Sequence, residues 1–202
     1  MIASLAQSRR PSLAAVTPLK KHWAGQIALV VAGSLVVALL AQVSIPLPFT
    51  PVPITGQTLG VLLVGGALGT WLGGASLLLY LLEGAVGLPV FASHASGIPF
   101  GPTGGYLVGF VVMAAVVGWL AERGWDRSVG KSIAAMVIGE AILYAIAVPW
   151  LGVYVGMEHA IPLGFLPFIA GDGLKLLLAG GMFPLAWKLV GIKPSADSKK
   201  SK

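Results

Sequence analysis

Two charged side chains stand in an otherwise apolar segment near the C-terminus, and they are the residues best suited to chemistry. Asp172 and Lys175 are three positions apart, so on a helix they share one face and can neutralise each other or grip a polar group together. In a membrane, such a pair is a candidate functional site, because charged groups there are costly. The alternative is an ion pair with a purely structural role.

The composition places this segment in a membrane protein. The chain of 202 residues is 56% hydrophobic and only 10% charged, and its mean hydropathy is +0.90, whereas about 25% of the residues of a soluble domain are charged. Spanning helices need about 20 apolar residues each, which leaves no room for a separate soluble enzyme domain. The absence of cysteine from the sequence excludes disulfides, thiolate metal sites and a cysteine nucleophile.

Apolar runs and helix breakers predict the elements of an all-α integral membrane protein. Residues 24–45 carry no charge and predict the first spanning helix, which the proline-rich residues 46–53 end. Residues 54–88 are too long for one span and contain several glycines, which favours two short helices joined by a tight turn. The other predicted spans are residues 103–121, 132–153 and 165–187, which leave connections at 89–102, 122–131 and 154–164.

The positive charges predict the orientation, because Lys and Arg collect on the cytoplasmic side of membrane proteins. With two helices in residues 54–88, segments 1–23, 122–131 and 188–202 lie on one side and hold 12 of the 13 Lys and Arg residues. The exception is Lys175. We therefore expect six spans in a membrane domain of residues 24–187, with flexible basic cytoplasmic tails at 1–23 and 188–202. The net charge of +6 then needs no nucleic acid to explain it.

This orientation gathers the unusual polar residues at the outer side. Asp172 and Lys175 fall in the outer half of the last helix, Glu83 lies near the outer end of the third, and Thr55 and Gln57 begin the second. The 46–53 and 89–102 loops also lie outside, so an outward-facing pocket is expected. Each polar residue has another use: Glu83 can mark a helix end at the interface, and Thr55 or Gln57 can cap a helix.

Known catalytic motifs are missing from the sequence. Residues 124–132 resemble a phosphate-binding loop, but five residues separate the two glycines where four are required, and no strand precedes them. The sequence contains no HExxH motif, no His cluster with metal-ligand spacing and no serine elbow. The chain therefore has no ATP-hydrolysing site of its own.

Three long stretches closely resemble the BioY family, whose members are the biotin-binding S components of energy-coupling-factor (ECF) transporters. These stretches are PVPITGQTL at 51–59, YLLEGAVGLPVF at 80–91 and GPTGGYLVGF at 101–110. The similarity extends to GDGLK at 171–175. The basic tails lie outside it.

The resemblance implies a multi-pass subunit of the bacterial plasma membrane that takes up biotin. Six helices, with helices 2 and 3 short, would hold biotin in an outward-facing pocket covered by extracellular loops, without a cofactor. A transmembrane scaffold protein and two cytoplasmic ATPases would supply the energy. The scaffold would dock on the small residues Ala24, Ala28 and Ala32, although alanine is common in membrane helices generally.

The chemistry of biotin suggests roles for the matched residues. Its ureido ring offers two N–H donors to Asp172 and a carbonyl acceptor to Lys175, as a charge-assisted clamp. Gln57 and Thr55 can add neutral hydrogen bonds, and Tyr106 or Phe91 can cover the rings. The predicted substrate-binding residues are Asp172, Lys175, Gln57, Thr55, Glu83, Tyr106, Phe91, Tyr80 and Tyr144. For the three tyrosines, a place in the interfacial aromatic belt is the alternative.

Three rival functions remain. A purely structural assembly subunit would tolerate Asp172→Ala without losing uptake. An S component for another vitamin, such as thiamin or riboflavin, would share this architecture. A membrane-embedded acyltransferase-like enzyme would need a nucleophile and a base, for which only Thr103 and His94 stand near the pocket; we predict no enzyme. Glu140, about eight residues into the fifth helix from the cytoplasmic side, can contact a partner or form internal hydrogen bonds.

Overall fold

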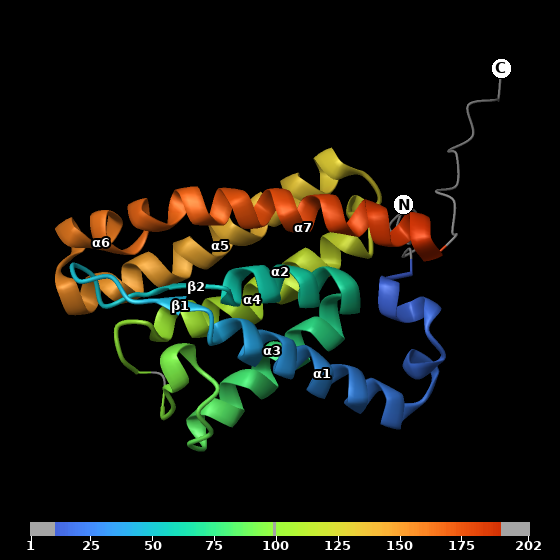
Figure 1. Ribbon diagram of the computed structural model, residues 1–202, viewed down its shortest axis with the longest axis horizontal. Helices are drawn as coiled ribbons and strands as arrows, with labels where there is room; N and C mark the ends of the chain where they lie inside the picture. The colour runs from blue at the N-terminus through green and yellow to red at the C-terminus, as the bar shows by residue number, and fades with distance from the viewer. Residues whose placement is uncertain (1–10, 99, 191–202) are drawn as a thin grey trace, which may run out of the picture.

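Residues 11–98 and 100–190 are described by the computed structural model, and they are mostly helical (Figure 1). The α-helices are α1 Trp23–Ala41, α2 Gln57–Leu68, α3 Thr70–Ala85, α4 Gly104–Ala121, α5 Val129–Val155, α6 Met157–Gly164 and α7 Ile169–Val190. Short 3₁₀ helices are η2 Leu13–Val16, η3 Pro18–Lys21, η4 Ala92–His94, η5 Trp125–Arg127 and η6 Leu166–Phe168. The strands β1 Ser44–Ile45 and β2 Ile54–Thr55 pair antiparallel, with Ser44 opposite Thr55.

Within the described residues, four stretches are long and apolar enough to cross a membrane: α1, α4, α5 and Met157–Val190. The predicted pair of short helices in residues 54–88 is confirmed, and α2 and α3 meet at Gly69, where φ is 87°. At 1.5 Å per residue, α2 is about 18 Å long and α3 about 24 Å, shorter than a hydrocarbon core of about 30 Å. Neither helix alone therefore fills a bilayer in the way the four longer stretches can.

Two boundaries differ from the sequence-based prediction. The first helix ends at Ala41 and not at residue 45, because the chain enters β1 after the C-cap residue Gln42. The side chain of Gln42 donates to the carbonyls of Ala38 and Val90, at 3.0 and 3.3 Å. The predicted connection at 154–164 contains the helix α6, which leads through η6 into α7.

Helix α4 lies at the centre of the molecule, between α5 on one side and α2 and α3 on the other (Figure 1). Of its span, 67% is buried, compared with 33% for α1. Glycines let its neighbours approach closely. A Cβ atom at Gly118 would lie 2.4 Å from the backbone carbon of Gly69, and one at Gly65 would lie 2.6 Å from the carbonyl oxygen of Ala114. The α2–α3 turn thus packs directly on the backbone of α4.

One end of the molecule gathers the N-terminal segment, the α2–α3 turn and the connection between α4 and α5. Glu122 accepts hydrogen bonds from the backbone N–H and the hydroxyl of Thr70, at 3.1 and 3.0 Å, and so caps the start of α3. Arg127 donates to the carbonyl of Pro11 at 3.1 Å. Trp187 of α7 donates to Asp126 at 2.6 Å. The described basic residues of the predicted cytoplasmic segments therefore share this end.

The predicted tails are described only in part. Residues 1–10 and 191–202 lie outside the described residues. Residues 13–21 form η2 and η3, and the buried Ser12 donates to the carbonyl of Leu68 at 3.4 Å. Lys20 in turn donates to the Ser12 hydroxyl at 3.2 Å. This part of the N-terminal segment is thus folded against the end of α2. Lys188 belongs to α7, which continues to Val190.

We predict that Gly118→Ala destabilises the protein, because the new methyl group meets backbone atoms of Gly69 and Thr70 that cannot move independently of the α2–α3 turn. Overpacking of this kind costs about 1–3 kcal/mol. The thermal unfolding midpoint of the purified protein in detergent should fall. Gly181→Ala is the matched control, because a Cβ there meets nothing within 4 Å. Equal midpoints for the two variants would contradict the close contact.

Candidate functional site

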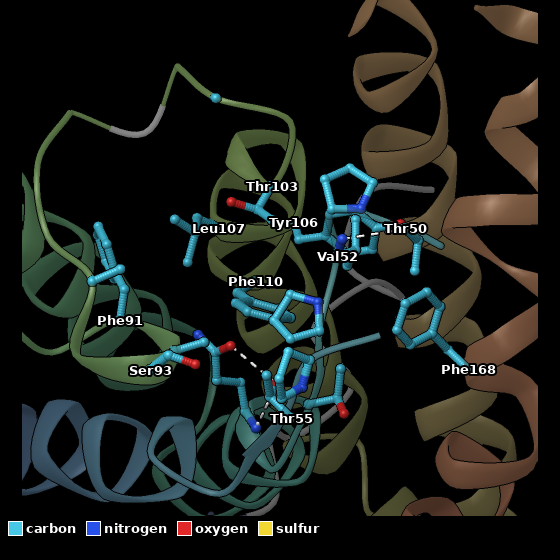
Figure 2. Close-up of a pocket in the computed structure, with 18 of the residues that line it drawn as sticks. Thr50, Val52, Thr55, Phe91, Ser93, Thr103, Tyr106, Leu107, Phe110 and Phe168 are labelled. Carbon is cyan, nitrogen blue, oxygen red and sulfur yellow. Dashed lines mark hydrogen bonds between the residues drawn. The ribbon is translucent and has the colours of Figure 1, made fainter. Parts of the chain in front are cut away.

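A cavity of about 460 Å³ opens at the end of the molecule opposite the folded N-terminal segment. Its wall comes from the proline-rich loop and β2, the 91–103 loop, the starts of α2 and α4, Tyr144 of α5, and the region from Phe168 to Lys175. In Figure 2, Phe91 and Phe168 face the cavity from opposite sides, while Thr103, Tyr106, Leu107 and Phe110 form the α4 wall. This volume is in the range of small-molecule binding sites.

The loops around the cavity are fixed by hydrogen bonds to their neighbours. Thr50 of the proline-rich loop donates to the carbonyl of Leu163 at 2.8 Å, and Tyr106 donates to the carbonyl of Gly164. On the other side, the indole N–H of Trp150 donates to the carbonyl of Gly101 at 3.0 Å. Helices α4, α5 and α6 thereby hold the segments that close the cavity.

The floor of the cavity is a network around the carboxylate of Asp172. Its Oδ1 accepts from the Lys175 ammonium at 2.9 Å and from the Thr58 hydroxyl at 3.3 Å, and its Oδ2 accepts from the Tyr144 hydroxyl. The Lys175 ammonium also donates to Thr58 at 2.7 Å. Asp172 is only 6% exposed, so desolvation strengthens each of these contacts. Three helices, α2, α5 and α7, meet at this one carboxylate.

A second, neutral network lies at the start of α2. Thr55 donates to the side-chain oxygen of Gln57 at 3.0 Å and accepts from its backbone N–H at 3.3 Å. The Gln57 amide donates to the hydroxyl of Tyr80 at 2.7 Å, and Tyr80 donates to the carbonyl of Val90 at 3.1 Å. Thr55 therefore binds the first backbone N–H of α2 and orients the Gln57 amide, which lines the cavity.

Aromatic rings cover the remaining surface. Phe91 packs edge-on against Tyr80, with centroids 5.4 Å apart. Its ring lies directly against Gly84, where a Cβ atom would be 2.1 Å from it. Tyr106 packs edge-on against Tyr144 at 6.3 Å. These contacts leave apolar ring surface next to the polar network, a combination suited to a ligand with an apolar body and a polar end.

The structure brings together seven of the nine residues predicted to bind substrate. Asp172, Lys175, Gln57, Thr55, Tyr106, Phe91 and Tyr144 line the cavity. Tyr80 and Glu83 do not. Tyr80 instead supports Gln57 from behind, and Glu83 accepts a hydrogen bond from the buried Ser34 of α1. The sequence placed Glu83 in the pocket from its position near the outer end of the third helix, and Tyr80 as part of the YLLEGAVGLPVF stretch that resembles the family.

Other residues that line the cavity were not predicted from the sequence. Thr58 of α2 donates to Asp172 and lies within the PVPITGQTL stretch, so its place in that stretch could have revealed it. Thr50, Leu107, Phe110, Leu143 and Phe168 also line the cavity, and as apolar or loop residues they carry no comparable signal. Thr103 lines the cavity, but His94 is not part of its wall, so these two do not form a nucleophile–base pair there.

The alanine stripe on the first helix lies on the outer surface. Ala24, Ala28 and Ala32 are exposed, whereas Gly33 and Ser34 of the same helix are buried. Gly33 packs closely against Ser76 of α3. These three small side chains therefore lie on the exposed face of α1.

We predict that Lys175→Met strongly destabilises the protein, because it leaves the buried Asp172 carboxylate without its countercharge. Breaking a buried ion pair from one side costs about 3–5 kcal/mol. The double variant Asp172→Asn with Lys175→Met should recover part of the loss, since no isolated charge remains. Thermal unfolding in detergent measures both, with the exposed Lys131→Met as control. A double variant less stable than Lys175→Met alone would contradict this role of charge balance.

Comparison with known proteins gives a consistent match. A sequence model of the BioY family matches residues 10–192. "Biotin transporter BioY" of Thermotoga maritima is 40% identical over 154 residues, which cover 75% of this chain and 90% of the relative. "Biotin transporter BioY" of Rhizobium etli is 37% identical over 156 residues, 72% of this chain and 83% of the relative.

A solved structure agrees with these relatives. The crystal structure of the S-component for biotin from an ECF-type ABC transporter superposes with a TM-score of 0.74 at 25% identity. The superposition covers 85% of this chain and 94% of the other.

Proposed function

The chain belongs to the BioY family, and we propose that it is a high-affinity biotin-binding subunit for biotin uptake, the S component of an ECF transporter. The observation that supports this most directly is the cavity, which places the Asp172–Lys175 pair beside Gln57 and apolar rings. The chain is a membrane protein of transport and not an enzyme, in keeping with its named relatives.

We propose that the ureido ring of biotin binds at the floor of the cavity, where hydrogen-bonding capacity is left over. A carboxylate offers about four acceptor sites and an ammonium three donors. Asp172 accepts three described hydrogen bonds and Lys175 makes two. One acceptor site and one donor thus remain, and Gln57 has a further amide N–H and a lone pair. A ligand with two N–H groups and one carbonyl matches this set.

The apolar parts of biotin would then lie against Phe91, Tyr106 and Phe168, which bound the cavity from three sides. The aliphatic tail would extend toward the 91–103 and proline-rich loops, where the cavity opens. In this arrangement Tyr80 is a positioning residue for Gln57, and Glu83 contributes to the α1–α3 contact through Ser34.

Six spanning segments with both termini cytoplasmic are also part of the proposal. In support, the described basic residues Lys20, Lys21, Arg123, Arg127, Lys131 and Lys188 belong to segments at the end of the molecule opposite the cavity, as expected for a cytoplasmic side. The cavity would then face outward in the bacterial plasma membrane, without a cofactor.

We further propose that a transmembrane scaffold and two cytoplasmic ATPases supply the energy, since the sequence has no phosphate-binding loop of its own. The exposed Ala24, Ala28 and Ala32 are the proposed docking face, because small residues allow close helix contact in a membrane. Biotin uptake by cells that contain this protein but lack the ATPase module would show that the partners are dispensable.

Calorimetry on the purified protein tests the ligand. Biotin should bind, whereas thiamin and riboflavin should not. Asp172→Asn should weaken biotin binding by about tenfold or more, because the charge-assisted hydrogen bonds to the ligand and to Lys175 become weaker ones. Glu158→Gln is the matched control, since that side chain is 74% exposed and outside the cavity. Unchanged affinity in a folded Asp172→Asn variant would overturn the proposed clamp, and preferential binding of another vitamin would overturn the ligand.

A bulky residue in the alanine stripe tests the docking face. Ala28→Trp should abolish co-purification with the scaffold and ATPases while biotin affinity stays within about twofold, because the side chain is exposed and far from the cavity lining. The control is Leu177→Trp on α7, which is already 61% exposed. Retention of the complex by Ala28→Trp would exclude this face as the contact.

A further inference from the structure

Glu140 is a buried acid that the proposed binding site does not use. It lies in α5, eleven residues after Val129, about 17 Å along the helix at 1.5 Å per residue. It is 6% exposed, and neither of its carboxylate oxygens has a hydrogen-bond partner within the described part of the chain. A carboxylate in such surroundings is costly when ionised, and it takes up a proton instead.

The position of Glu140 relates it directly to the ion pair. Glu140 and Tyr144 are four residues apart and share one face of α5, and the Tyr144 hydroxyl contacts Asp172 of α7. Helices α5 and α7 lie side by side and run in opposite directions (Figure 1). Glu140 is one turn before Tyr144 on α5, and Lys175 is one turn after Asp172 on the antiparallel α7. Glu140 and Lys175 are therefore at about the same level. The charges of Asp172 and Lys175 both act on Glu140.

Few other titratable groups face Glu140. On its own helix Tyr144 is nearest, with Lys131 and Tyr154 more than two turns away. From α7, Asp172 and Lys175 face it, and α4 contributes only Tyr106. The acids and bases of the elements at the two ends of α5 lie more than ten residues away along the helix: Asp126 and Arg127 of η5, and Glu158 and His159 of α6. Glu140 therefore decides whether this interior cluster is neutral or carries one net negative charge.

We propose that Glu140 is a proton-binding site linked to the ligand site, so that the protein binds an anionic ligand most tightly when Glu140 is protonated. The inference rests on the proposed function, because biotin carries a carboxylate that is ionised above about pH 6. With Glu140 neutral, the Asp172–Lys175 pair leaves the cluster uncharged, and the ligand carboxylate meets no net charge beneath the ureido ring. With Glu140 ionised, the same anion meets an uncompensated negative charge. Ligand binding therefore takes up a proton wherever Glu140 is ionised in the free protein.

The sign of the linkage follows from this preference. Because the protonated protein binds the anion more tightly, affinity is highest at low pH and decreases as the pH rises through the titration of Glu140. Because the ligand carboxylate lies toward the loops and Glu140 one turn below the ion pair, their separation is on the order of 15–20 Å, and at an effective dielectric constant of about 20 one charge then changes affinity by about fivefold. Glu140→Gln keeps the shape of the side chain and removes the titration.

Calorimetry of biotin binding from about pH 6 to about pH 9 tests the linkage. Wild type should lose about fivefold in affinity across this range, and in two buffers of different ionisation enthalpy it should show proton uptake on binding. Glu140→Gln should bind at pH 6 like wild type, with a flatter pH profile and no proton uptake. Glu158→Gln, which changes an exposed acid, should retain the wild-type profile. Biotin amide, which is uncharged, should show little dependence on pH in wild type.

Equal pH profiles in wild type and Glu140→Gln would overturn the inference, as would a wild type whose affinity does not change with pH. Failure of wild type to bind biotin at any pH would instead overturn the proposed function, and the linkage with it. If Glu140→Gln does not fold, infrared spectroscopy of wild type decides the question. The carbonyl band of a protonated buried carboxyl group should persist to higher pH with biotin than without it, and a band unaffected by biotin would exclude the linkage.

Discussion

The arrangement of the helices around the cavity depends on one buried ion pair. Asp172 and Lys175 are both on α7, but their further hydrogen bonds are made with α2 and α5, through the hydroxyl groups of Thr58 and Tyr144. Removing two charges from water is costly, and their mutual attraction compensates only when further hydrogen bonds satisfy the remaining atoms. The pair therefore stabilises the fold only in the one arrangement in which α2, α5 and α7 converge.

The two ends of the molecule, on either side of this ion pair, are held together by different kinds of contact. At the end that carries the N-terminal segment, the short helices α2 and α3 turn at Gly69 against the backbone of α4, and Glu122 caps α3. Contacts there are close and involve backbone atoms. At the other end, loops are held mostly by side-chain hydrogen bonds, from Thr50 and Trp150 to carbonyl groups and from Gln42 to the carbonyls of Val90 and Phe91.

Much of the fold followed from the sequence because its main determinants are local. Apolar runs predicted α1, α4, α5 and α7, and the glycines of residues 54–88 predicted a break, which the structure places at Gly69. The end of α1 and the helix α6 were not predicted. Both depend on contacts between distant residues, such as those of Gln42 with Val90, and a hydropathy pattern contains no information about these partners.

The binding site shows the same division between local and distant information. A polar group in a membrane helix must be satisfied, and either a ligand or a neighbouring helix can satisfy it. The sequence shows that such a polar group needs a hydrogen-bond partner, but it does not show whether that partner is a ligand or a neighbouring helix. In the sequence, Glu83 and Asp172 are both acids near the outer ends of helices. In the structure, Glu83 accepts a hydrogen bond from Ser34, 49 positions earlier in the chain, whereas Asp172 lines the cavity. Glu140 is the third case, an acid that no described residue satisfies. For such a residue, a proton is the smallest partner that removes the cost of burial.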